Sequence, residues 1–190
     1  MTLKARAYCY LGAFSASCVL LAACTSANGT IPTPPPATSS PASATPPETA
    51  QEREERLAYE AAEKAYRAFR AEYDRISNTR GASPKATKRM TDNAAGPYLE
   101  VMSGFLRYKK TRHQTGDRPI RIRHVRRGGY SPKELVLLIC EDGSRVRVFD
   151  ARGKQVSRGQ VSDMTLYVRP VEGRWKVWNG DQEVVKKCDD

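Results

Sequence analysis

The sequence has few of the residues that build catalytic and metal centres. It contains two histidines, His113 and His124, and five cysteines among 190 residues. These residues lack the spacing of zinc ligands. The sequence also offers no glycine-rich phosphate loop and no Ser-His-Asp or Cys-His set that it would bring together. We therefore predict no catalytic residue, no metal site and no cofactor.

Acidic residues are missing from the start of the chain, since none precedes Glu48. Lys4 and Arg6 come before an apolar stretch of 15 residues, Ala7 to Leu21. This stretch is shorter than the roughly 20 residues that a membrane-spanning helix needs. Positive charge, a short apolar run and then small residues are typical of a signal peptide, which we assign to residues 1–23. The alternative is a buried N-terminal helix.

The apolar stretch ends in Leu21-Ala22-Ala23-Cys24. This tetrapeptide resembles the lipobox of bacterial lipoproteins. The resemblance implies that the Cys24 thiol is acylated and that cleavage makes Cys24 the first residue. Two or more acyl chains anchor a protein stably in a bilayer, whereas one chain does not. The implied location is therefore the cell membrane, with the chain lipid-anchored on its extracytoplasmic face. The alternative is ordinary secretion with an unmodified Cys24.

The cysteines are Cys9, Cys18, Cys24, Cys140 and Cys188. Cleavage removes the first two, and lipidation consumes the third. An even pair remains in a chain that is exported to an oxidising compartment. We therefore predict a Cys140–Cys188 disulfide, and the alternative is two free thiols.

Residues 24–49 form a stretch with almost nothing to bury. Of the 25 residues after Cys24, seven are proline, ten are serine or threonine, and only Glu48 is charged. Such a composition is typical of a disordered, extended segment. We interpret it as a stalk that holds one folded domain, residues 50–190, away from the membrane.

The domain begins with a helical pattern. Thr49-Ala-Gln-Glu52 matches a capping box. The apolar residues that follow recur every three or four positions, which predicts a long amphipathic helix from Glu52 to Ile76. Its apolar stripe consists of Tyr59, Ala62, Tyr66, Phe69, Tyr73 and Ile76.

Two shorter helices are predicted next. Ser83-Pro84 favours a start for one that runs to Asp92, and Gly96-Pro97 favours a start for another. The expected apolar face of the third helix comprises Tyr98, Val101, Met102, Phe105 and Leu106.

The remaining sequence alternates with a period of two, which is typical of strands. "ELVLLIC", residues 134–140, is continuously apolar and predicts a central strand buried on both faces. Asp142-Gly143 predicts a hairpin into "SRVRVFD", and Met164, Leu166 and Val168 are expected on one face of a later strand. Helices followed by strands indicate an α+β fold with an antiparallel sheet.

This order resembles the nuclear transport factor 2 superfamily. In many members the last strands carry Gly-x-Trp-x-Val, which Gly173, Trp175 and Val177 match. The resemblance implies one long and two short helices packed on a bent, cone-shaped antiparallel sheet, with a pocket between the sheet and the long helix. The segments "AEKAYRAFRAEYDRI" and "LVLLICEDGSRVRVFDARGK" also look like those of uncharacterised actinobacterial and prophage lipoproteins.

His124 is the one histidine within a predicted strand. Under strict alternation it shares the face of Ile120 and Ile122, where it would point into the cone. If a bulge intervenes, Val125 takes that face instead. Glu141-Asp142-Gly143 is better explained as turn chemistry than as a carboxylate site.

Positive charge is the strongest functional signal. The whole chain has a formal net charge of +11. Between Arg107 and Lys133 there are ten basic residues against Asp117 alone. We predict that part of this segment forms a patch for an anionic surface, which consists of Arg118, Arg121, Arg123, Arg126 and Arg127.

Two classes of function follow. The first is a non-catalytic binding module at the cell envelope, anchored in the bilayer through Cys24, with an anionic polymer or a protein as partner. The second is a small-molecule-binding or enzymatic cone-fold protein. A nucleic-acid reader is a weaker third class. The basic composition fits it, but the predicted export separates the chain from most nucleic acid, and no recognition motif is present. We therefore predict no specific nucleic-acid partner.

Overall fold

The computed structural model describes residues 47–189 of the chain. The predicted signal peptide, Cys24 and almost all of the predicted stalk lie outside the described residues. Pro46–Asp190 form one compact unit, and its buried apolar core lies between Ala58 and Val177. Because this unit contains its own core, we expect it to fold by itself.

The domain opens with helix α1, Ala50–Asn78. Thr49 caps it: the Thr49 hydroxyl accepts the backbone N–H of Glu52, and the Glu52 carboxylate accepts the N–H of Thr49. The predicted capping box is therefore confirmed. All six residues of the predicted apolar stripe are buried in the core.

The two shorter helices differ in detail from the predictions. Helix α2, Lys88–Asn93, begins after Thr87, whose hydroxyl accepts the backbone N–H of Met90. The predicted start at Ser83-Pro84 was therefore wrong, because Thr87 supplies the side-chain cap. In helix α3, Gly96–Thr111, Tyr98 and Leu106 are buried, but Val101 and Phe105 are each 56% exposed. The buried face of α3 is thus narrower than predicted.

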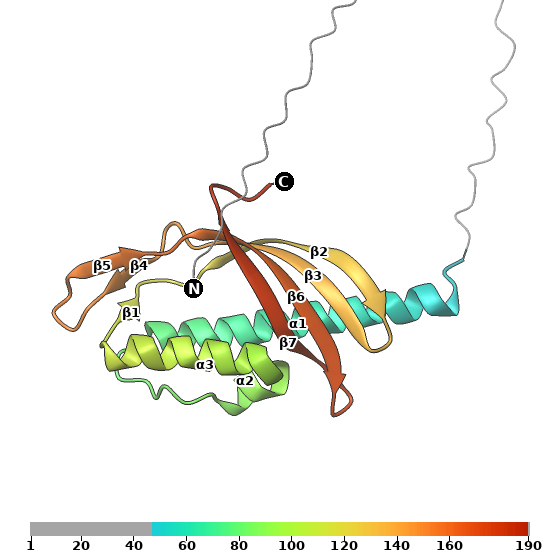
Figure 1. Ribbon diagram of the computed structural model, residues 1–190, viewed down its shortest axis with the longest axis horizontal. Coiled ribbons are helices and arrows are strands. Elements are labelled where there is room, and N and C mark those ends of the chain that lie inside the picture. The colour runs from blue at the N-terminus through green and yellow to red at the C-terminus, as the bar shows by residue number, and fades with distance from the viewer. Residues whose placement is uncertain (1–46, 190) are drawn as a thin grey trace, which may run out of the picture. The chain divides into compact units, whose positions relative to one another are not determined.

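The main sheet has four antiparallel strands: β2, Arg121–Ser131; β3, Glu134–Asp142; β6, Val161–Val171; and β7, Arg174–Val185. Their order in space is β2-β3-β6-β7, so β2 and β7 form the edges. The sheet arches over α1 and α3 (Figure 1). This arrangement confirms an α+β fold in which helices pack on an antiparallel sheet.

The central strand β3 is buried mainly on one face. Leu135, Leu137 and Ile139 belong to the core beneath the sheet, whereas Leu138 points the other way and is 36% exposed. The prediction of burial on both faces was wrong, because no helix of the described chain packs on the outer face at Leu138. The strand β6 matches its prediction, since Met164, Leu166 and Val168 are all buried in the core.

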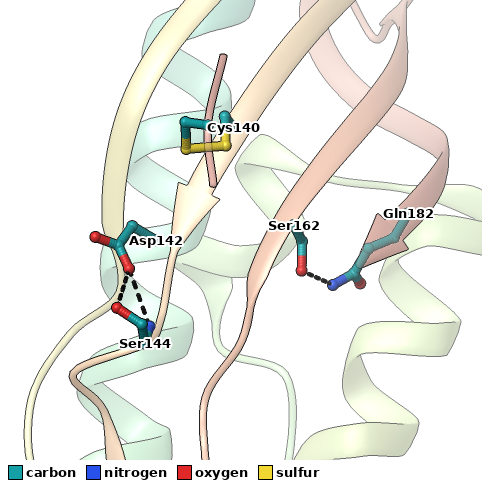
Figure 2. Close-up of a disulfide and its surroundings, with 6 residues drawn as sticks. Cys140, Asp142, Ser144, Ser162 and Gln182 are labelled. Atoms are coloured by element: carbon teal, nitrogen blue, oxygen red, sulfur yellow. Dashed lines mark hydrogen bonds between the residues drawn. A yellow bond between two sulfur atoms is a disulfide. The ribbon is translucent and has the colours of Figure 1, made fainter. Parts of the chain in front are cut away.

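A second sheet joins β1, Thr115–Gly116; β4, Arg147–Phe149; and β5, Gln155–Arg158, in the order β1-β4-β5. The predicted hairpin at Asp142-Gly143 was wrong, because β3 pairs with β2 and β6 and not with β4. The Asp142 carboxylate instead accepts the backbone N–H and the hydroxyl of Ser144 at 3.0 and 2.6 Å (Figure 2). This local turn sends the chain out of the main sheet. No helix within residues 47–189 has the length and apolar character to cross a membrane.

Candidate functional site

A cavity of about 480 Å³ lies between α1, α3 and the main sheet. One wall is apolar, and Phe105 and Val101 stand there half in solvent. Polar groups converge on the other side, where Arg70 of α1, Lys109 of α3 and Glu141 of β3 line the cavity. The cavity therefore offers an apolar surface beside a set of ionised groups, as small-molecule sites commonly do.

Two of the charged residues that line the cavity, Arg70 and Glu141, belong to a buried network that also includes Asp74. Nη2 of Arg70 lies 3.1 Å from Oδ1 of Asp74, and its Nε lies 3.1 Å from Oε1 of Glu141. All three side chains are at most 9% exposed. The Nε–H does not meet hydrogen-bond geometry with any described partner, so its contact with Glu141 is electrostatic. Glu141 also accepts the hydroxyl proton of Tyr66.

Burial and charge shift the pKa values in this network. Burial by itself would lower the pKa of Arg70, but the charges of Glu141 and Asp74 outweigh it and hold this pKa above its ordinary value. Burial raises the pKa of Asp74 despite the opposing charge of Arg70. Burial also raises the pKa of Tyr73 to about 12, and burial lowers the pKa of Lys109 with help from the charge of Arg70. Tyr73 therefore stays neutral at physiological pH and Arg70 stays charged.

His124 lies outside this cavity. A register shift between Ile122 and His124 pairs His124 with Cys140, whose neighbours in β3, Ile139 and Glu141, face the core. Val125 packs against the core instead. The strict-alternation reading was therefore wrong and the bulge reading is confirmed. A β-bulge shifts the side-chain alternation by one position, so His124 lies on the outer face of the sheet.

The predicted anionic-surface patch lies along the edge strand β2 and the loop before it. Arg118 pairs with Asp117 at 3.3 Å. Arg121, Arg123, Arg126 and Arg127 are exposed, and none of these four has a carboxylate within 4 Å in the part of the chain that is described. Hydrogen bonds from Ser144 lower the pKa of Asp142, and the charges of Arg123 and Arg121 lower it further.

The strand register places the side chains of this patch on both faces of the sheet. Arg126 pairs with Leu138 and so shares the outer face of the sheet, whereas Arg127 pairs with Leu137, a core residue. The guanidinium of Arg127 lies 5.1 Å from the ring centre of Tyr59 in α1. We call Arg121, Arg123, Arg126 and Arg127 the β2 arginines.

The outer face of the sheet carries opposite charges at its two sides. A shallow hollow of about 320 Å³ has His124 and Arg126 at its β2 side. At its β6 and β7 side it has Asp163, Asp181 and Glu183. An anionic partner is therefore favoured at the β2 edge and opposed at the other edge.

Cys140 is joined to Cys188, with their Cα atoms 5.7 Å apart. The predicted disulfide is therefore confirmed. Figure 2 shows it on the side of β3 that faces away from the helices. The bond fixes the segment after β7 over the outer face of the sheet, where Cys140 is completely buried.

Sequence reasoning missed Arg70 and Glu141 as site residues, although local patterns indicate that each side chain faces the core. Arg70 falls within the apolar stripe of α1, four residues after Tyr66. Glu141 is two residues after Ile139, so the strand period of two places it on the core face. The interpretation of Glu141 as a turn residue was wrong for its side chain. Within residues 47–189, no cluster of three or more His, Cys, Asp or Glu side chains is arranged to hold a metal ion.

No protein-family model and no curated protein sequence matches this chain. Among solved structures, the chain is similar to the intermembrane space region of the chloroplast protein ARC6. That likeness has a TM-score of 0.51 at 9% identity and covers 66% of this chain and 96% of the other. It shows a shared fold and nothing about function.

A more distant likeness is an uncharacterised protein with a cystatin-like fold from Caulobacter vibrioides. Its TM-score is 0.43 at 12% identity, with 68% of this chain and 90% of the other covered. A protein of unknown function with a cystatin-like fold from Nostoc punctiforme has a TM-score of 0.39 at 14% identity, with 72% and 93% covered.

Proposed function

We propose that this protein is a lipid-anchored extracytoplasmic module that binds anionic components of the cell envelope and turns over no substrate. The observation that carries the proposal is the row of β2 arginines, which are exposed on an edge strand without a close carboxylate partner among the described residues. Each such basic residue contributes about 1 kcal/mol near an anionic membrane surface. The domain is proposed to be of the cone-shaped, nuclear transport factor 2-like kind, which the order of its elements supports.

Two features of the chain support the anchor. Leu21-Ala22-Ala23-Cys24 matches a lipobox, and the two cysteines that would remain beside Cys24 after cleavage form a disulfide. A disulfide between them is consistent with an oxidising compartment. A tethered domain meets the nearby surface at a high effective concentration, so a modest affinity is enough for binding.

We predict acylation at Cys24. Mass spectrometry of the mature protein should find Cys24 as the first residue, carrying fatty acyl groups. Cys24→Ala should leave the protein uncleaved or release it into the medium, because two acyl chains supply most of the anchoring free energy. A mature N-terminus at another residue, without acyl groups, would refute the anchor.

The binding itself should be electrostatic. We expect residues 46–190 to bind vesicles that contain anionic lipid more tightly than neutral vesicles. Raising the salt concentration should weaken this binding, because the Debye length falls from about 10 Å at 0.1 M to about 3 Å at 1 M. Co-sedimentation over a salt series measures the effect. Equal binding to both vesicle types would contradict the proposal.

A second candidate function is small-molecule binding in the central cavity. The observation that favours it is the apolar wall beside the network of Arg70, Asp74 and Glu141. A ligand held there chiefly by the apolar wall would bind with little dependence on salt. The salt series therefore separates the two candidates.

A further inference from the structure

A second cavity lies at the end of the domain where α1 and α3 both finish. Figure 1 shows these two helix ends beside β1 and the β4–β5 hairpin. The cavity has a volume of about 500 Å³ and is lined by residues 80–84 and 110–115, except 83 and 112, together with Ala151. Three segments that are distant in the sequence thus enclose one space, which we call the Arg80 pocket.

The lining of the Arg80 pocket is cationic. Arg80, Lys110 and His113 contribute basic side chains, and no carboxylate is among its described lining residues. Thr111, Gln114 and Thr115 add neutral hydrogen-bonding side chains. At about 500 Å³, the pocket has room for an anionic group with a small attached moiety and is larger than a single ion needs.

Backbone carbonyls position two of these cations without neutralising their charge. Arg80 Nη2 donates to the Ala151 carbonyl at 3.1 Å. Lys110 Nζ donates to the Thr79 carbonyl at 2.7 Å. Burial lowers the pKa of Lys110, which marks a cost of desolvating the ammonium that a bound anion would offset.

The acidic residues near this end are engaged elsewhere. Asp150 accepts the backbone N–H groups of Arg152 and Lys154 at 2.8 and 3.0 Å. Asp117 accepts the Arg147 backbone N–H and side chain at 2.8 and 2.9 Å. Neither carboxylate lines the pocket, so the field inside it is positive.

His113 occupies a backbone conformation in which glycine has a lower conformational energy. It follows the C-cap of α3 with a φ of 52°, in the left-handed region that suits glycine at this helix position. A side chain there is disfavoured by roughly 1 kcal/mol relative to glycine.

We propose that the Arg80 pocket binds a phosphate group of a small phosphorylated compound or of a lipid headgroup. The Arg80 guanidinium presents a planar set of donors that matches phosphate oxygens. Lys110 supplies a second cationic contact from the opposite segment, and the His113 imidazole supplies a further nitrogen for hydrogen bonding. This site is separate from the β2 arginines, so it goes beyond the proposed function.

The test uses residues 46–190 with glycerol phosphate and inorganic phosphate as soluble probes, followed by NMR titration. Binding should shift the resonances of residues 80–84 and 110–115. Arg80→Gln should weaken binding at least about tenfold, since a hydrogen bond to a charged group contributes about 1.5–3 kcal/mol. Arg145→Gln, an exposed arginine outside the pocket lining, is the matched control and should leave binding unchanged.

His113→Gly separates binding from folding. Glycine suits the positive φ at this position, so this variant should be at least as stable as the wild type. It should nevertheless bind the phosphate probes more weakly. Wild-type affinity in both His113→Gly and Arg80→Gln, or no shift in the pocket residues on titration, would overturn the proposal.

Vesicles that contain phosphatidylglycerol distinguish the two sources of phosphate. If the headgroup is the ligand, Arg80→Gln should weaken vesicle binding, and glycerol phosphate should compete with it. If a soluble compound is the ligand, the probes should bind while Arg80→Gln leaves vesicle binding unchanged. Reversing the charges of Arg121 and Arg123 should not alter binding of the soluble probes, so the two binding proposals succeed or fail separately.

Discussion

Arg70→Met should lower the free energy of unfolding of residues 46–190 by about 3–5 kcal/mol. Arg70 is the buried cation that lies 3.1 Å from both Asp74 and Glu141. Its removal leaves buried Glu141 without a cation in contact and buried Asp74 with only the weaker influence of the Lys109 charge. A poorly compensated buried charge is far more costly than the loss of an exposed ion pair. Urea unfolding at pH 7 measures the change.

Arg67→Met is the matched control, because Arg67 lies one turn earlier on α1 and pairs with Glu63 in solvent. Exposed pairs of this kind contribute little to stability. The loss of unfolding free energy caused by Arg70→Met should also become smaller as the pH falls. Burial already raises the pKa of Asp74, and loss of the Arg70 charge raises it further. Ionised Asp74 therefore destabilises the variant at a pH above this pKa, and protonation of Asp74 relieves the destabilisation at a pH below it. Equal effects of the two variants would contradict this account of the network.

Cys188→Ser should lower the free energy of unfolding by about 2–5 kcal/mol, as is typical for loss of a disulfide in a small secreted domain. The bond joins residues 48 positions apart, and it restricts the unfolded chain more than a short loop would. It also fixes the segment after β7 over the fully buried Cys140. Chemical denaturation without reductant measures the difference from the wild type.

Reduced wild-type protein and the double variant with Cys140→Ser should show a similar loss, because each lacks the same bond. Non-reducing peptide mapping of the native protein should recover Cys140 joined to Cys188. Ready labelling of both thiols in native protein would show that the bond is absent there, and an unchanged unfolding free energy in Cys188→Ser would refute its stabilising role.

Local chemistry made several features predictable from the sequence. The Thr49 and Glu52 pair is a short-range capping signal, and the α1 stripe repeats with the period of a helix. The disulfide prediction followed from counting the cysteines that would remain after the predicted cleavage and lipidation. Each of these features depends on few residues or on one regular pattern. Contacts between distant segments therefore change these features little.

Other features depend on contacts between distant segments. The β2 bulge moves His124 to the outer face, and only the pairing of β2 with β3 shows it. The Asp142-Gly143 signal was read as a hairpin, but the pairing of β3 with β6 displaces β4 into the second sheet. The Arg70–Glu141 contact unites α1 and β3 across 71 positions, so no local pattern could reveal the pair.

Charge reversal tests most directly whether the β2 arginines bind an anionic surface. The measurement compares binding of residues 46–190 to anionic vesicles for the wild type and for Arg121→Glu with Arg123→Glu. We expect the charge-reversed variant to lose at least about 30-fold in affinity, because two basic residues at about 1 kcal/mol each are removed and two negative charges are added.

Lys64→Glu with Lys85→Glu is the control, since it makes the same change in net charge at two exposed lysines outside β2. We expect this control to keep most of the wild-type affinity while the β2 variant loses it. Circular dichroism should show that both variants are folded. If the two variants lose affinity equally, net charge alone governs binding, and the claim that the β2 edge is the binding surface is wrong.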